Sequence, residues 1–172
     1  MAIRTANLRL EPARLDDLET VARGDGALCA ALGLSVAPHW AGPDALAAIG
    51  RSRDFLIANP GSVDWWMHFI VHVTDIRLIG LGGFKGEPED GTVEIGYELA
   101  PGYRGRGLAT EAARGMVDHA FANPGVDRVI AHTLPTESAS TTILKRLGLR
   151  FDGELDDPDD GYIWRWRLER AG

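Results

Sequence analysis

A loop rich in glycine and arginine stands directly before a one-sided helical pattern. Residues 104–107 read Arg-Gly-Arg-Gly, and apolar side chains then recur at helical spacing over residues 109–120. Glycines let consecutive backbone N–H groups converge on an anion, and the helix dipole favours negative charge at the same place. Arg104 and Arg106 add positive charge, and Thr110 adds a hydroxyl donor. The loop predicts a phosphate or pyrophosphate site; the alternative is a turn whose arginines face solvent.

The elements that must position this loop alternate between strands and helices. Strands are expected over residues 8–11, 65–74, 77–84, 92–99, 126–133, 151–155 and 162–168. Helices are expected over residues 15–22, 43–58, 108–122 and 138–147, with loop and short helix over residues 23–41. A strand, a crossover helix and a following strand indicate one parallel pair inside an otherwise antiparallel sheet. The fold class is therefore α+β, with a mixed sheet of six or seven strands and helices on both faces.

Composition excludes several classes of protein. The chain has 172 residues and a formal net charge of −7, which favours a single domain over residues 1–172 and argues against nucleic-acid binding. The one cysteine, Cys29, cannot form an intramolecular disulfide, so it is expected to be an inert, partly buried side chain. No secretory leader or membrane span is visible, which predicts a cytoplasmic protein with no membrane partner. Histidine spacing predicts no metal site.

The segment from Glu94 to Ala112 resembles the coenzyme A signature of the GNAT superfamily of acetyl-CoA-dependent N-acetyltransferases. The core pattern Gln/Arg-x-x-Gly-x-Gly/Ala is matched by Arg104, Gly107 and Ala109. Residues 77–82 match it too, but an acidic turn follows them rather than a helical pattern. Only the second match has a strand, a loop and an amphipathic helix in order, so the resemblance implies a GNAT fold with acetyl-CoA as cosubstrate.

A later segment resembles the branch that includes ribosomal-protein N-terminal acetyltransferases. That branch carries Pro-Glu-Asn-x-x-Ser, and here residues 135–140 read Pro-Thr-Glu-Ser-Ala-Ser, so Glu137 stands where the family has asparagine. Leu149 replaces the phenylalanine that ends the branch's Glu-Lys-Leu-Gly-Phe motif. The resemblance implies that pantetheine lies between strands 92–99 and 126–133. The residues it implies for cofactor binding are Leu99, Arg104, Gly105, Arg106, Gly107, Leu108, Ala109, Thr110, Glu137 and Ser140.

Catalysis by the family requires a base and a donor to the leaving thiolate. An alkylammonium has a pKa near ~10.4, so a carboxylate must remove its proton directly or through water. Glu94 and Glu98 lie on one strand face, and the family's strand carboxylate matches Glu94 best, with Glu98 as the second choice. The family's tyrosine donor is Leu144 here, so the branch resemblance points to Ser140. The structural alternatives are a salt-bridged strand carboxylate and a helix-capping serine.

The acceptor amine stays open, as do two other classes of protein. A peptide or protein N-terminus and a small-molecule amine both fit the chemistry, and a homodimer is left open. The first alternative is a catalytically silent acyl-CoA-binding or regulatory module. The second is a dinucleotide-binding protein, although Thr110 stands where the third glycine would be needed. Six acidic residues between 152 and 160 lead us to expect a turn that attracts cationic acceptors.

Overall fold

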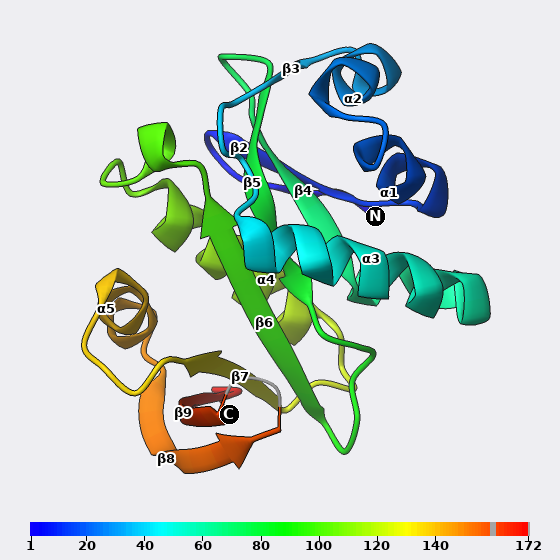
Figure 1. The fold of residues 1–172 in the computed structure, drawn as a ribbon. Helices are drawn as coiled ribbons and strands as arrows, with labels where there is room; N and C mark the ends of the chain where they lie inside the picture. Colours follow the sequence, from blue (N-terminus) through cyan, green and yellow to red (C-terminus); the bar gives the residue numbers. More distant parts are fainter. Residues whose placement is uncertain (159–160, 172) are drawn as a thin grey trace.

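The computed structural model describes residues 1–158 and 161–171, and the strands of this part form one nine-stranded sheet (Figure 1). The order is β1-β2-β4-β5-β6-β7-β9-β8, with β3 paired to β5. The strands are β1 (Ile3–Arg4), β2 (Leu8–Pro12), β3 (Ser35–Val36), β4 (Met67–His72), β5 (Arg77–Phe84), β6 (Thr92–Leu99), β7 (Arg128–Thr133), β8 (Arg150–Asp157) and β9 (Gly161–Glu169). Among the described strands, β6 and β7 form the one parallel pair that was expected, and the short β3 adds a second by pairing in parallel with β5. The expected α+β class with a mostly antiparallel sheet is confirmed.

The sheet has two more strands than the seven whose ranges the sequence predicts. The additions, β1 and β3, each contain two residues. A two-residue strand is too short to show the alternation on which strand prediction depends. Backbone pairing with a neighbouring strand, which the sequence does not reveal, defines both of them.

Helices cover both faces of the sheet, as expected. Figure 1 shows α3 crossing one face and α4 lying behind the other. The helices are α1 (Leu15–Val21), α2 (Asp25–Leu32), α3 (Pro43–Ala58), α4 (Leu108–Ala122) and α5 (Ala139–Arg146), with short 3-10 turns η1 (Pro60–Trp65) and η2 (Pro101–Tyr103). No helix within the described residues is long and apolar enough to span a membrane.

The start of α4 is fixed by glycine and its length by an apolar stripe. Gly107 is the N-cap residue and has a left-handed backbone, with φ of 78°. Ala112, Ala113 and Met116 have no exposed surface, so this face of α4 packs on the sheet. The helix ends at Ala122, directly before residues 123–125, whose Asn-Pro-Gly sequence cannot continue it.

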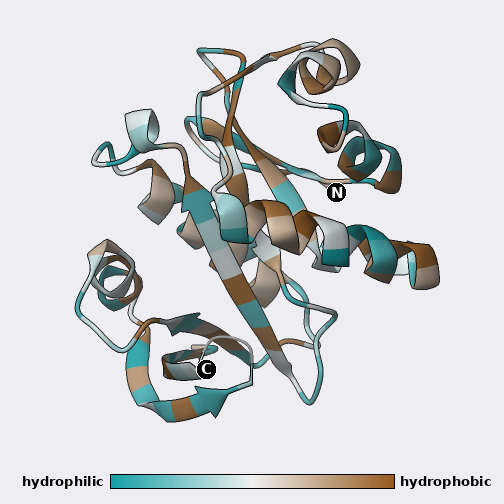
Figure 2. Ribbon diagram, in the orientation of Figure 1, coloured by the Kyte–Doolittle hydropathy of each residue, from teal (hydrophilic) through white to brown (hydrophobic). Residues whose placement is uncertain are grey.

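Hydrophobic and hydrophilic residues alternate along β6 (Figure 2), and this alternation separates two chemical environments. Ile95 pairs with Phe84, whose ring lies 5.8 Å from that of His119 on α4, so the apolar face of β6 points toward α4. Glu94 and Glu98 occupy the opposite face. A Cβ on Gly42, the N-cap of α3, would lie 2.8 Å from Oε1 of Glu98. Both carboxylates therefore belong to the side that α3 covers.

Strands β6 and β7 separate partway along their length. Their parallel pairing starts at Thr92 and Arg128 and ends at Glu94 and Ile130. Residues 95–99 continue as a strand edge that pairs only with β5. This is the gap expected between the two strands, and it leaves backbone groups of β6 free for a ligand.

Candidate active site

A groove of about 480 Å³, the β6–β7 groove, opens where the two strands separate. It is formed by the end of β6, by residues 104–107, which we call the glycine loop, and by the first turns of α4 and α5. The candidate cofactor residues that line it are Leu99, Arg104, Gly105, Gly107, Ala109, Thr110 and Ser140. The structure therefore brings together Leu99 and Ser140, which are 41 positions apart in the sequence.

The glycine loop presents an uninterrupted series of unpaired backbone donors. The N–H groups from Gly105 to Thr110 donate to no other residue in the described part of the chain. Gly105 and Gly107 have φ of 71° and 78°, a backbone conformation that costs other residues energy. Unpaired amides at a helix N-terminus are suited to an anion, because the helix dipole adds to their positive ends. The loop fits a pyrophosphate group.

The two arginines of the loop have different surroundings. Nε of Arg104 donates to the carbonyl oxygen of Leu99 at 2.9 Å, and this side chain lines the groove. The guanidinium of Arg106 lies 5.0 Å from the ring centre of Tyr103 and does not line the groove. Arg104 is therefore the loop cation that faces the groove, while Arg106 lies over the ring of Tyr103.

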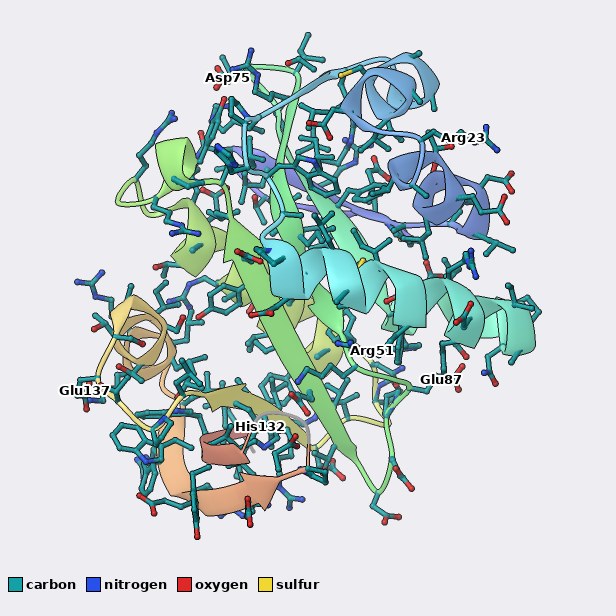
Figure 3. The ribbon with its side chains drawn as sticks, in the orientation of Figure 1. Arg23, Arg51, Asp75, Glu87, His132 and Glu137 are labelled. Carbon is teal, nitrogen blue, oxygen red and sulfur yellow. The ribbon has the colours of Figure 1, made fainter. Side chains whose placement is uncertain are left out.

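Two other candidate cofactor residues lie outside the groove lining. Leu108 is buried in the core. Glu137 accepts a hydrogen bond from Thr141 and pairs with Lys145 at 2.7 Å, and these partners lower the pKa of its carboxyl. Figure 3 shows Glu137 at the outer side of α5. In this structure its charge is directed away from the groove.

Ser140 and the helix cap of α5 are separate residues. Ser138 is the N-cap, and its hydroxyl accepts from the backbone N–H of Thr141 at 3.3 Å. Ser140 lines the groove and is partly exposed. Leu144, one turn further on, is buried. The capping role suggested as an alternative for Ser140 thus belongs to Ser138.

A second cavity of about 530 Å³, the α3 cavity, lies between α3 and the sheet. Small residues create the space, among them Ala48 on α3 and Gly82 on β5. Its polar lining includes Arg51, which reaches from α3 toward the sheet (Figure 3), as well as Lys85 and Glu98. Glu98 and Tyr97 line both this cavity and the β6–β7 groove. The two spaces therefore meet at the end of β6.

Glu94 lies in a cluster of charges beside the α3 cavity. Its Oε1 is 2.5 Å from Nζ of Lys85 and 3.0 Å from Nδ1 of His132, which Figure 3 labels on β7. Burial raises the pKa of Glu94, but the interactions with His132 and Lys85 outweigh burial and hold it below its ordinary value. Glu94 is thus ionised at neutral pH, and neither ion pair uses its Oε2.

The sequence did not identify Tyr97 as a site residue. Its hydroxyl is buried and has no hydrogen-bond partner among the described residues. Burial also raises the pKa of Tyr97 to about 12. Its place on the predicted signature strand was the only available signal, because its unpaired hydroxyl becomes visible only in three dimensions.

The first of the acidic residues expected to attract cations is engaged in ion pairs with arginines of β9. Asp152 pairs with Arg165 at 2.7 Å and with Arg167 at 3.5 Å. Asp157 lines the α3 cavity, whereas residues 159–160 lie outside the described part. Within the described residues, no group of three or more His, Cys, Asp or Glu side chains could hold a metal ion.

Known proteins match most of the length of this chain. A family model described as an acetyltransferase (GNAT) domain matches residues 7–150. The uncharacterised N-acetyltransferase YjdG of Bacillus subtilis (strain 168) is 28% identical over 147 residues, which cover 85% of this chain and 88% of the relative.

Solved structures share the fold at low sequence identity. The ribosomal L7/L12 alpha-N-protein acetyltransferase RimL, solved with coenzyme A, superposes with a TM-score of 0.68 at 15% identity, over 98% of each chain. A GNAT-family acetyltransferase from Bacillus anthracis gives a TM-score of 0.67 at 19% identity, also over 98% of each chain.

Proposed function

Because the chain belongs to the GNAT family of N-acetyltransferases, we propose that it transfers an acetyl group from acetyl-CoA directly to a primary amine. The observation that carries this proposal is the run of unpaired N–H groups from Gly105 to Thr110, at the mouth of the β6–β7 groove. These amides and Arg104 would hold the pyrophosphate. The unpaired edge of β6, ending at Leu99, would bind pantetheine as a neighbouring strand does.

Glu94 is the proposed base. Bound acetyl-CoA supplies a thioester whose carbonyl carbon is open to attack by a neutral amine. Glu94 carries its charge at neutral pH and leaves Oε2 free to accept the amine proton, directly or through water. Lys85 and His132 hold Oε1 and so fix the direction of the carboxylate. Glu98, on the same face and at the meeting point of the two spaces, is the alternative base.

Ser140 is the proposed donor to the departing thiolate. The residue lines the groove in the first turn of α5, where the helix dipole also favours negative charge. A thiol with a pKa near ~8.5 leaves readily, so one hydroxyl donor is sufficient. The transfer is direct, and no acyl-enzyme is formed.

The α3 cavity is the proposed acceptor site, because it meets the β6–β7 groove at Glu98 and is lined by Lys85, which pairs with Glu94. A peptide or protein N-terminus and a small-molecule amine both remain candidates for it. Incubation of the protein with acetyl-CoA and separate panels of peptides and small amines, followed by mass spectrometry, identifies the acceptor class. We expect N-acetylated products within one panel, and acetylation confined to the hydroxyl or thiol groups of these compounds would contradict the proposal.

A catalytically silent acyl-CoA-binding module is the second candidate. It is favoured by Leu144 at the position of the family's tyrosine donor and by Glu137, which points away from the groove. Such a module would bind acetyl-CoA without amine-dependent release of CoA.

A further inference from the structure

Tyr97 combines burial, an unpaired hydroxyl and a position between the two binding spaces. The hydroxyl has no hydrogen-bond partner in the described part of the chain, and the residue lines both the β6–β7 groove and the α3 cavity. A buried hydroxyl without a partner costs free energy, because it has lost its hydrogen bonds to water. Such a group calls for a ligand atom or another explanation.

The backbone of Tyr97 also faces the gap between β6 and β7. Lys85 donates to the carbonyl of Glu94, and the N–H of Ala100 donates to Ile79, so even-numbered residues of β6 direct their backbone groups toward β5. Odd-numbered residues then direct theirs to the other edge, where pairing with β7 has ended after Glu94. The N–H of Tyr97 therefore points into the gap.

The chemistry of the phenol limits what it can do. With a pKa of about 12 it stays protonated throughout the range in which enzymes are assayed, so it is a hydrogen-bond donor rather than a base. Complete proton transfer to a thiolate whose conjugate acid has a pKa near ~8.5 is unfavourable by about three orders of magnitude. A phenol of this kind is suited to an oxygen that gains negative charge without taking the proton.

We propose that the Tyr97 hydroxyl donates a hydrogen bond to the carbonyl oxygen of the bound thioester and stabilises the negative charge that develops there. This inference rests on the proposed acetyl transfer. The amine nitrogen forms a bond to the carbonyl carbon, the C–S bond breaks with its electron pair going to sulfur, and the amine proton goes to Glu94. Tyr97 keeps its proton throughout, and its backbone N–H lies on the same strand edge.

The test is Tyr97→Phe, which removes the hydroxyl and keeps the ring. Tyr162→Phe is the matched control, because Tyr162 is 67% exposed and lines neither space. The first measurement is kcat with an amine that the wild-type protein acetylates, together with the Kd of CoA. The second needs no turnover: it is the infrared carbonyl stretch of bound acetyl-CoA labelled with ¹³C at the carbonyl.

We expect Tyr97→Phe to lower kcat about 100-fold, the usual effect of losing one such donor, with the Kd of CoA unchanged. The carbonyl stretch should lie at lower frequency in the wild type and in Tyr162→Phe than in Tyr97→Phe. The free energy of unfolding should not fall, since no hydrogen bond within the protein is lost. A kcat within threefold of wild type, an unchanged carbonyl stretch, or weakened CoA binding that accounts for the loss would overturn the assignment.

The two readouts separate this inference from the proposed function. A wild-type protein that acetylates no amine, yet shows a carbonyl shift that disappears in Tyr97→Phe, would contradict acetyl transfer and support the role of Tyr97. Normal turnover of amines, with the same carbonyl stretch in the wild type and in Tyr97→Phe, would support acetyl transfer and contradict the role of Tyr97.

Discussion

Glu94 gains its chemical character from residues remote in the sequence. Lys85 follows β5 and His132 lies on β7, and both contact Oε1 of Glu94. The strand pattern predicts that Glu94 and Glu98 share a face, which the structure confirms. The ion pairs could not be predicted, because they depend on which strands become neighbours. For the same reason, the sequence could not show that the hydroxyl of Tyr97 is buried without a partner among the described residues.

Replacing Glu94 with Gln should lower kcat/KM at pH 7 by about 100-fold, as loss of a general base typically does. The loss should shrink above about pH 9.5, where more of the amine is already neutral. Because the pKa of Glu94 is held below its ordinary value, the wild-type rate should not lose this base until the pH falls below the usual carboxyl range. The pH profile of kcat/KM measures both effects.

Glu98→Gln is the control for that experiment, since Glu98 lies four residues along the same face. A larger and more strongly pH-dependent loss in Glu98→Gln would transfer the role of base to Glu98. An unchanged pH profile of kcat/KM in both variants would show that neither carboxylate is the base and that water takes the amine proton.

His68 provides a test of stability rather than catalysis. Its side chain has no exposed surface, and burial lowers its pKa to about 4 from the usual value near ~6.5. Between these values the unfolded chain binds a proton that the folded protein does not, so the free energy of unfolding falls as the pH is lowered. The resulting loss of folding free energy reaches about 3 kcal/mol once the pH is below both pKa values. It is absent above about pH 7.

Urea unfolding from pH 7 to pH 4 should therefore show a shallower acid loss in His68→Leu than in the wild type. His39→Gln, at an exposed histidine, is the control for the loss of one histidine from the chain. Equal slopes in all three proteins would show that His68 is not neutral in the folded state.

At the scale of elements, long segments with a clear period were the most predictable. Strand β6, the glycine loop and helix α4 agree with expectation because alternation, glycine and an apolar stripe are local signals. Helix α2 was expected only as part of a loop with short helix, since residues 23–41 have no period. Leu108 belongs to the signature motif, but its position on the helix directs its side chain into the core. A motif match therefore does not by itself identify the residues that line the groove.

The junction between loop and helix gives the next prediction. In Gly107→Ala, a Cβ would meet no atom within 4 Å, so the cost comes from the left-handed backbone alone. We expect the free energy of unfolding to fall by about 1–2 kcal/mol. The Kd of acetyl-CoA should rise about tenfold or more as the amides turn away.

Gly102→Ala is the matched control, because Gly102 has open space and no left-handed backbone. Calorimetric titration with acetyl-CoA and urea unfolding check both variants. Equal affinities would show that the loop amides do not hold the cofactor.

At the scale of the whole molecule, one sheet separates the side covered by α4 from the side covered by α3. Helix α4 and the β6–β7 groove occupy one side, α3 and its cavity occupy the other, and the two spaces meet at Tyr97 and Glu98. The resemblance of one segment implied the groove. The α3 cavity was not predictable, because small residues from α3, β5 and β6 create it together.

The proposed function requires that an acetyl group pass from a cofactor in the β6–β7 groove to an amine in the α3 cavity. The most direct measurement is therefore the rate of CoA release from acetyl-CoA as a function of amine concentration. We predict a rate above the amine-free background that rises and saturates with at least one peptide or small amine. Tight binding of acetyl-CoA with no amine-dependent release across both panels would contradict the account and identify a silent binding module.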